Sequence, residues 1–177
     1  MIGILLNDNG YEQDIRELLM AFYPGETFVH EEQENREDVR FYVEGKVNRE
    51  KQVFSLSLCF PGSSRFHVPE DLEPEVRKEW EAAGESAEIS VDYEDRFETK
   101  NRIKRRLYVL LMGETGRQLP WGTLTGIRPT KIAMTKLAEG DSPEEIFRYM
   151  KETYFTSDEK IRLSIEIAQR ERRLLSA

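Results

Sequence analysis

The segment Leu119–Lys131, which reads LPWGTLTGIRPTK, holds the residues best suited to chemistry in this sequence of 177 residues. It combines Trp121 with the cations Arg128 and Lys131 and is rich in Gly, Pro and Thr. Turn residues are usual in surface loops, but a large aromatic side chain beside cations is not. The sequence therefore predicts that this backbone path and these three side chains serve a purpose.

Two interpretations of the segment stay open on physical grounds alone. Pro129 suits the first position of a helix, whose free N–H groups attract anions. Arg128 and Lys131 add positive charge there, and Arg can hold a carboxylate or a phosphate with two hydrogen bonds. Alternatively, Trp121 and Leu124 fill a hydrophobic gap and Arg128 pairs with an acid of the same chain.

Other catalytic or metal-binding patterns are absent from the sequence. The two histidines, His30 and His67, do not stand at metal-ligand spacing, and Cys59 lies in an apolar run typical of a core strand. Nothing singles out a catalytic triad, and GTLTG lacks the Lys-Ser/Thr of a phosphate loop. We expect no catalytic residue and no metal site in these residues.

Composition and charge restrict the classes of protein to which this sequence could belong. The net charge of −8 disfavours nonspecific binding to nucleic acid. One cysteine, no signal-peptide pattern and no long apolar run predict a soluble cytoplasmic protein that does not span a membrane. The acids are concentrated in residues 69–98, whereas residues 99–136 are strongly basic.

The elements that would position the segment follow from periodicity. Strands are predicted at Met1–Asn7, Thr27–His30, Val39–Val47, Val53–Phe60 and Ala87–Tyr93, with Val39–Val47 and Val53–Phe60 forming a hairpin and residues 31–38 a charged connection. Helices are predicted at Tyr11–Tyr23, Pro69–Ala83, Asp95–Glu114, Pro129–Glu139 and Pro143–Thr153, and in a last stretch towards Leu175. The fold class is therefore α+β, a small antiparallel or mixed sheet with helices on one face, followed by a helical C-terminal segment.

Three of these elements have sharper local signals. Gly140 ends the predicted helix Pro129–Glu139. Ser142 followed by Pro143 and Glu145 is a capping box. In Asp95–Glu114, the predicted apolar stripe includes Phe97 and Ile103, and Gly113 or Gly116 ends the helix.

The segment also resembles a known family. LPWGTLTGIRPTK, followed by Ser142-Pro143-Glu144-Glu145 and then by KETYFTSDEK, resembles the region before the catalytic barrel of HemZ-type coproporphyrinogen dehydrogenases. These are radical SAM proteins similar to the oxygen-independent coproporphyrinogen III oxidase of haem biosynthesis. The resemblance is specific over residues 118–170 and loose over residues 1–117.

The resemblance implies cofactors that this sequence does not hold. The family's CxxxCxxC motif binds a [4Fe–4S] cluster, which leaves one iron open for S-adenosylmethionine. Because Cys59 is the only cysteine, no cluster ligand, S-adenosylmethionine contact or catalytic residue carries over. The resemblance thus implies an α+β accessory domain (1–117), then a loop and helices (118–177) leading to a radical SAM barrel absent from this chain. The full-length protein would be the enzyme, and this portion alone would not.

Three functions follow as expectations. In the first, the chain docks on its own barrel through Trp121, Arg128 and Lys131, and these residues help to bind a porphyrinogen, whose propionates suit cations. In the second, the chain is a nucleic-acid-binding module that uses the basic helix with Lys100, Arg102, Lys104, Arg105 and Arg106, although the acidic block could neutralise that helix internally. In the third, it is a protein-interaction or dimerisation domain.

Overall fold

The computed structural model describes residues 1–31, 38–61 and 71–175 of the chain. The predicted connection at 31–38, the start of the predicted helix at Pro69, and His67 lie wholly or partly outside these ranges. The chain divides into two compact units, Met1–Arg117 and Gln118–Ala177. Their roles as an accessory domain and as a segment leading to a barrel stay predictions.

Unit 1 contains a mixed sheet with strand order β2-β1-β3-β4-β5. Its strands are β1 (Ile2–Leu6), β2 (Phe28–Val29), β3 (Tyr42–Asn48), β4 (Val53–Cys59) and β5 (Glu88–Ser90). The interior strand β1 runs parallel to both of its neighbours, β2 and β3. The pairs β3–β4 and β4–β5 are antiparallel, so the predicted hairpin is confirmed.

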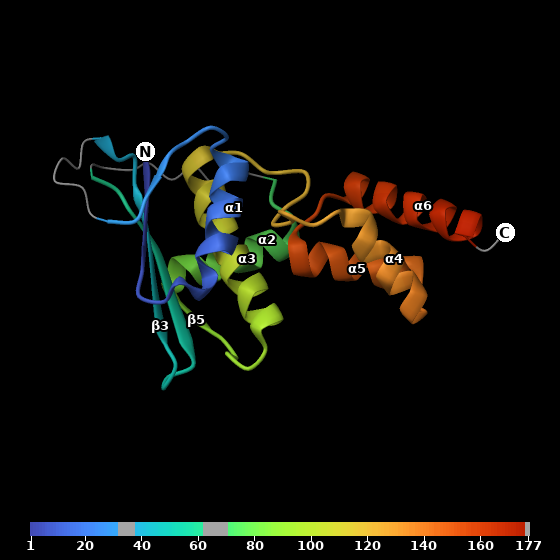
Figure 1. Cartoon of the computed structure of the whole chain (residues 1–177), viewed down its shortest axis with the longest axis horizontal. Helices are drawn as coiled ribbons and strands as arrows, with labels where there is room; N and C mark the ends of the chain where they lie inside the picture. The colour runs from blue at the N-terminus through green and yellow to red at the C-terminus, as the bar shows by residue number, and fades with distance from the viewer. Residues whose placement is uncertain (32–37, 62–70, 176–177) are drawn as a thin grey trace. The chain divides into compact units, whose positions relative to one another are not determined.

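Three helices of unit 1 lie on one face of this sheet (Figure 1). They are α1 (Glu12–Phe22), which follows the short 3-10 helix η1 (Asn9–Tyr11), α2 (Pro74–Glu85) and α3 (Arg96–Thr115). The core between sheet and helices is built from fully buried aliphatic and aromatic side chains, among them Ile4, Leu18, Phe54, Leu56, Ile103 and Leu107. Burial of this apolar area is the main stabilising contribution to unit 1.

Three details of unit 1 differ from the sequence prediction. Helix α2 begins at Pro74, so residues 71–73 of the predicted helix Pro69–Ala83 are not helical, because a residue before proline avoids helical backbone and Glu73 is extended (ψ 145°). Strand β5 is shorter than the predicted strand Ala87–Tyr93. Phe97 is 49% exposed rather than part of the buried stripe, because it is the second residue of α3 and precedes the buried part of the helix, which starts at Thr99.

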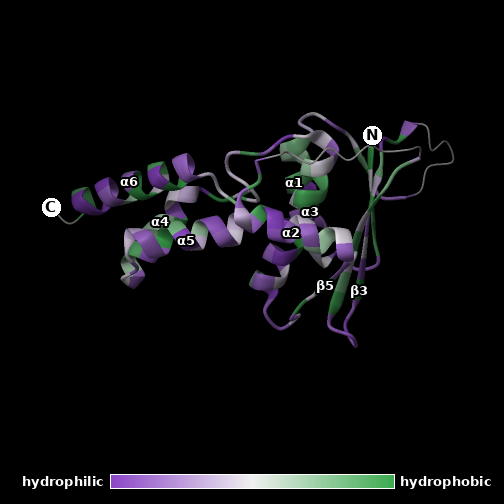
Figure 2. Cartoon of the chain, turned by 180° about the vertical axis from the view of Figure 1, so that it is seen from behind, coloured by the Kyte–Doolittle hydropathy of each residue, from purple (hydrophilic) through white to green (hydrophobic). Residues whose placement is uncertain are grey.

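Unit 2 is helical. It consists of the loop that starts at Gln118 and of helices α4 (Pro129–Glu139), α5 (Pro143–Tyr154) and α6 (Asp158–Leu175). Small and branched side chains of the three helices form its core, namely Ala133, Leu137, Ile146, Met150, Ile161, Ile165 and Ala168. Figure 2 shows hydrophobic residues interspersed with hydrophilic ones along these helices, as expected for amphipathic packing.

The ends of these helices follow local signals in the sequence. Gly140 closes α4 with a left-handed backbone (φ 99°). Ser142 and Glu145 form the predicted capping box at the start of α5, with each side chain accepting a hydrogen bond from the other residue's backbone N–H. The predicted fold class, an α+β sheet with helices on one face followed by a helical segment, is confirmed. No helix among the described residues is long and apolar enough to cross a membrane, and the cytoplasmic location stays a prediction.

Candidate functional site

The loop before α4 is anchored by Gly122 and Thr123. Gly122 has φ 58°, and a Cβ there would lie 1.9 Å from the carbonyl oxygen of Tyr154. The same oxygen accepts the backbone N–H of Thr123 at 2.7 Å and its hydroxyl at 3.3 Å. Because this approach is too close for any side chain at position 122, glycine is required by both space and backbone.

Two further hydrogen bonds hold the loop against the junction of α5 and α6. The backbone N–H of Ser157 donates to the carbonyl of Pro120 at 3.0 Å. The hydroxyl of Thr156 donates to the carbonyl of Trp121 at 3.4 Å. The path of the loop is therefore fixed by residues more than 30 positions further along the chain.

Trp121 is half-buried and stacks with a cation. The ammonium nitrogen of Lys160, on α6, lies 5.7 Å from the centre of the indole ring. Leu124 packs against the core of unit 2. The hydrophobic role considered for Leu124 is therefore observed, whereas Trp121 presents part of its ring to solvent beside Lys160.

Arg128 and Lys131 lie together on the first turn of α4. Arg128 is the residue before the helix, and the backbone N–H of Lys131 donates to its carbonyl at 3.0 Å. Both side chains are exposed, and neither makes an ion pair or hydrogen bond with a described residue. The alternative in which Arg128 pairs with an acid of the same chain is thus not observed among these residues.

The three predicted side chains do not form one cluster in the described structure. Arg128 and Lys131 share a helical turn, but no hydrogen bond or cation–π contact joins either of them to Trp121 in the described part of the chain. Lys160, which contacts Trp121, was not predicted, since only the folded structure brings residues 121 and 160 together.

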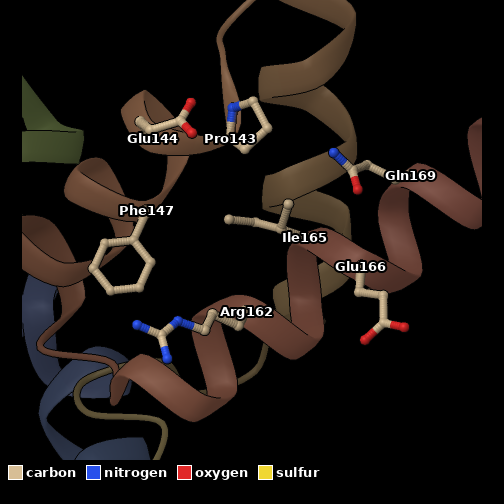
Figure 3. A pocket seen from close by; sticks show the side chains of 7 residues that line it. All are labelled: Pro143, Glu144, Phe147, Arg162, Ile165, Glu166 and Gln169. Carbon is tan, nitrogen blue, oxygen red and sulfur yellow. The ribbon is translucent and has the colours of Figure 1, made fainter.

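A shallow groove lies between α5 and α6, with a volume of about 480 Å³ (Figure 3). Its apolar part consists of Phe147 and Ile165, while Arg162 lies beside the Phe147 ring with its guanidinium carbon 5.7 Å from the ring centre. Glu144 and Glu166 also line it. The groove combines an apolar floor with charges of both signs, a pattern that the sequence prediction did not identify.

The basic helix α3 is largely neutralised within unit 1. Arg106 is buried, and its guanidinium donates to Glu79 and to the carbonyl of Ser86, each at 2.7 Å. Arg105 pairs with Glu98 at 2.8 Å. The acidic block therefore supplies internal partners for the basic helix, as the sequence had suggested.

The remaining cations of α3 do not form an exposed row either. Lys104 is 5% exposed, and burial lowers the pKa of its ammonium group. Lys100 lies 3.7 Å from Asp14 of α1. This arrangement does not favour the nucleic-acid-binding alternative.

No group of three or more His, Cys, Asp or Glu residues that could hold a metal ion occurs within the described ranges. Cys59 is partly buried on β4, and burial raises the pKa of its thiol, with a further contribution from Glu44. A raised pKa leaves the thiol protonated and poorly nucleophilic at neutral pH.

The fold and the loop define an α+β protein with an added helical unit that presents an anchored Trp-containing loop and two exposed cations. Comparison with known proteins then gives a specific relative. The chain is 43% identical over 74 residues to the oxygen-independent coproporphyrinogen-III oxidase-like protein HemZ of Bacillus subtilis (strain 168). The resemblance inferred from the loop and the capping-box motif is thereby confirmed.

The match is partial on both sides. It covers 42% of this chain and 15% of the length of the Bacillus subtilis protein. No protein-family profile matches the chain, and no solved structure matches it.

Proposed function

We propose that the chain is the N-terminal accessory portion of a radical SAM oxidoreductase that resembles oxygen-independent coproporphyrinogen III oxidase. The observation that carries this proposal is the 43% identity over 74 residues to a protein of that description. The whole protein would convert coproporphyrinogen III to protoporphyrinogen IX in haem biosynthesis, in the cytoplasm.

The cofactors of that reaction would be bound outside these 177 residues. A [4Fe–4S] cluster of this class needs three cysteine thiolates, and the sequence has one cysteine. When bound to the barrel, the cluster and S-adenosylmethionine would supply the radical chemistry. The residues of this chain would contribute docking and substrate binding only.

The docking role belongs to the loop of unit 2. Its backbone is fixed by the hydrogen bonds to Tyr154, so the exposed edge of Trp121 is held in a defined place at little entropic cost. Half-exposed aromatic residues on a rigid backbone are common anchors of protein interfaces. We expect this edge to pack on the barrel.

The substrate role belongs to Arg128 and Lys131. A porphyrinogen with four propionates presents carboxylates, which suit two exposed cations at the start of α4. Because neither cation has a partner among the described residues, neither would have to break an ion pair to bind a carboxylate. The expected contribution of such partly exposed contacts is about 1 kcal/mol each.

The test compares Arg128→Ala, Lys131→Ala and Trp121→Ala in the full-length enzyme. The cation variants are expected to raise KM for coproporphyrinogen III by about fivefold each, with kcat and the melting temperature kept. Trp121→Ala is expected to lower the melting temperature. Arg148→Ala, which removes an exposed cation from α5, serves as the matched control and should change neither quantity.

Each form of the proposal can fail separately. If the cation variants keep the substrate affinity of the wild type, propionate binding is wrong. If substrate affinity and stability are both unchanged in all three variants, the docking role is wrong as well.

A further inference from the structure

The side of α6 that faces away from the core carries a second apolar stripe. Leu163 is 40% exposed and Leu174 is 79% exposed, and Ile167 between them is partly exposed. Ile167 is not among the side chains that pack on the core of unit 2. This stripe contributes nothing to the described core, so its apolar area is available to a partner.

The spacing of the stripe is that of a coiled-coil seam. Leu163, Ile167, Arg170 and Leu174 follow one another at intervals of four, three and four residues. Intervals of four and three bring residues to one face of a helix, and they define the a and d positions of the heptad repeat. We call these four residues the α6 seam.

We propose that the α6 seam pairs with the α6 seam of a second copy of this chain, with the two helices antiparallel. This interaction surface is separate from the loop used in the proposed function and does not depend on it. A two-fold axis across the seam places Leu163 against Leu174 of the second copy. The same axis places Ile167 against Arg170 of the second copy. A single register therefore gives each of the four seam residues a partner in the second copy.

Charges beside the seam favour this orientation. Glu166 and Arg173 occupy the two flanking positions on one side of the seam, both exposed. In the antiparallel register, Glu166 of one copy faces Arg173 of the other, and the two-fold axis repeats this ion pair. Flanking ion pairs of this kind set the partner and the orientation in coiled coils.

The parallel orientation brings like charges together. It would place Arg170 against Arg170 of the second copy within the seam, and Glu166 against Glu171 beside it. Like charges in such positions oppose association. The seam is therefore complementary to itself in one orientation and not in the other.

Arg170 is the polar residue of the seam. Its guanidinium pairs with Glu166 of the same helix, four residues earlier. Its aliphatic part can cover Ile167 of the second copy while this charged end stays at the edge of the contact. A polar residue at a seam position lowers the affinity but fixes the register, so we expect a reversible dimer with a dissociation constant on the order of 10 μM.

The test measures the mass of the 177-residue chain by sedimentation equilibrium as its concentration rises. The expected result is a shift from one chain to two. Leu174→Asp should weaken the dimer by at least about tenfold, because it buries a charge in the seam. Leu175→Asp is the matched control, since Leu175 is 81% exposed but points about 100° away, and it should leave the dimer unchanged.

Charge reversal tests the orientation. Glu166→Arg and Arg173→Glu should each weaken the dimer, and the double variant should restore it, while circular dichroism confirms that all variants stay helical. A chain that remains monomeric at high concentration overturns the proposal. A dimer that tolerates Leu174→Asp, or that loses as much affinity through Leu175→Asp, overturns it too.

Discussion

The carbonyl oxygen of Tyr154, at the end of α5, accepts both the backbone N–H and the hydroxyl of Thr123. Two residues 31 positions apart thus share a double hydrogen bond, which ties the Trp-containing loop to the junction of α5 and α6. Because Gly122 contacts the same carbonyl, the whole loop is positioned by one small region. The geometry of Trp121 therefore depends on backbone contacts that no side chain of the loop provides alone.

Substitution of Gly122 tests this dependence. Gly122→Ala is expected to destabilise unit 2 by about 2–4 kcal/mol, because a Cβ would collide with the Tyr154 carbonyl and the backbone is left-handed. Hydrogen exchange at the Thr123 amide should become much faster. Gly140→Ala is the control: it shares the positive φ but has open space, so only about 1 kcal/mol of backbone strain is expected. Equal effects of the two substitutions would contradict the steric explanation.

The capping box of α5 gives a second prediction. Ser142→Ala removes the hydroxyl that accepts the Glu145 backbone N–H at 3.2 Å and should cost about 1 kcal/mol. Ser142→Asp should retain most of the stability, since Asp is also a good cap. The melting temperature of the chain, with the helical signal of circular dichroism as the probe, distinguishes the two variants. The prediction fails if alanine and aspartate at position 142 behave alike.

Elements with local signals were predictable from the sequence. Ser142, Pro143 and Gly140 specify helix ends through their own backbone and side-chain chemistry, and each lies where the sequence placed it. The start of α2 was missed although Pro74 carries the signal, because a proline five residues earlier carries the same one. The exposure of Phe97 could not be predicted, because it depends on where along α3 the packing against unit 1 begins, which is a property of the tertiary structure.

The sequence identified the loop as unusual but did not predict its contacts. Its composition identified Trp121, Arg128 and Lys131 as unusual, and Pro129 correctly predicted the start of α4. The contact of Gly122 with Tyr154, and that of Trp121 with Lys160, join residues far apart in sequence and follow only from the packing of α5 and α6. The α6 seam, by contrast, has a spacing that could have been recognised in the sequence.

Asp8 should make unit 1 sensitive to acid. The N–H of Gly10 donates to its carboxylate at 2.8 Å and Arg49 donates at 3.0 Å, and these two bonds lower the pKa of Asp8 below its ordinary value of 3.8. Since the pKa is lower in the folded state, the stabilisation is present above pH 3.8 and is lost as the pH falls through the folded pKa. Asp8→Asn should therefore reduce the loss in the free energy of unfolding, measured in urea, as the pH falls below 3.8. Glu50→Gln removes an exposed charge and serves as the control that should leave this pH dependence unchanged.

Tyr23 should make the stability of unit 1 sensitive to alkaline pH. Burial raises the pKa of its phenol to about 12, with a further contribution from Glu114, and its hydroxyl has no hydrogen-bond partner among the described residues. Because the folded pKa exceeds the ordinary value of 10.0, the stabilisation is present below pH 10 and is lost as the pH rises towards 12. Tyr23→Phe should change the free energy of unfolding by less than about 1 kcal/mol at neutral pH. Above pH 10 the variant should become more stable relative to the wild type, because it has no phenol to ionise. A constant difference in melting temperature across this range would contradict the assignment.

Arg106 distinguishes a structural from a nucleic-acid-binding role for α3. Its buried guanidinium satisfies both Glu79 and the Ser86 carbonyl, so Arg106→Ala leaves a poorly solvated carboxylate and is expected to cost about 3–5 kcal/mol. Arg102→Ala, on the same helix and partly exposed, should cost less than about 0.5 kcal/mol. A gel shift at low salt should show no binding of the wild-type chain to nucleic acid, since phosphate contacts are strongest there. Binding that Arg102→Ala abolishes, together with a mild effect of Arg106→Ala on stability, would reverse the assignment.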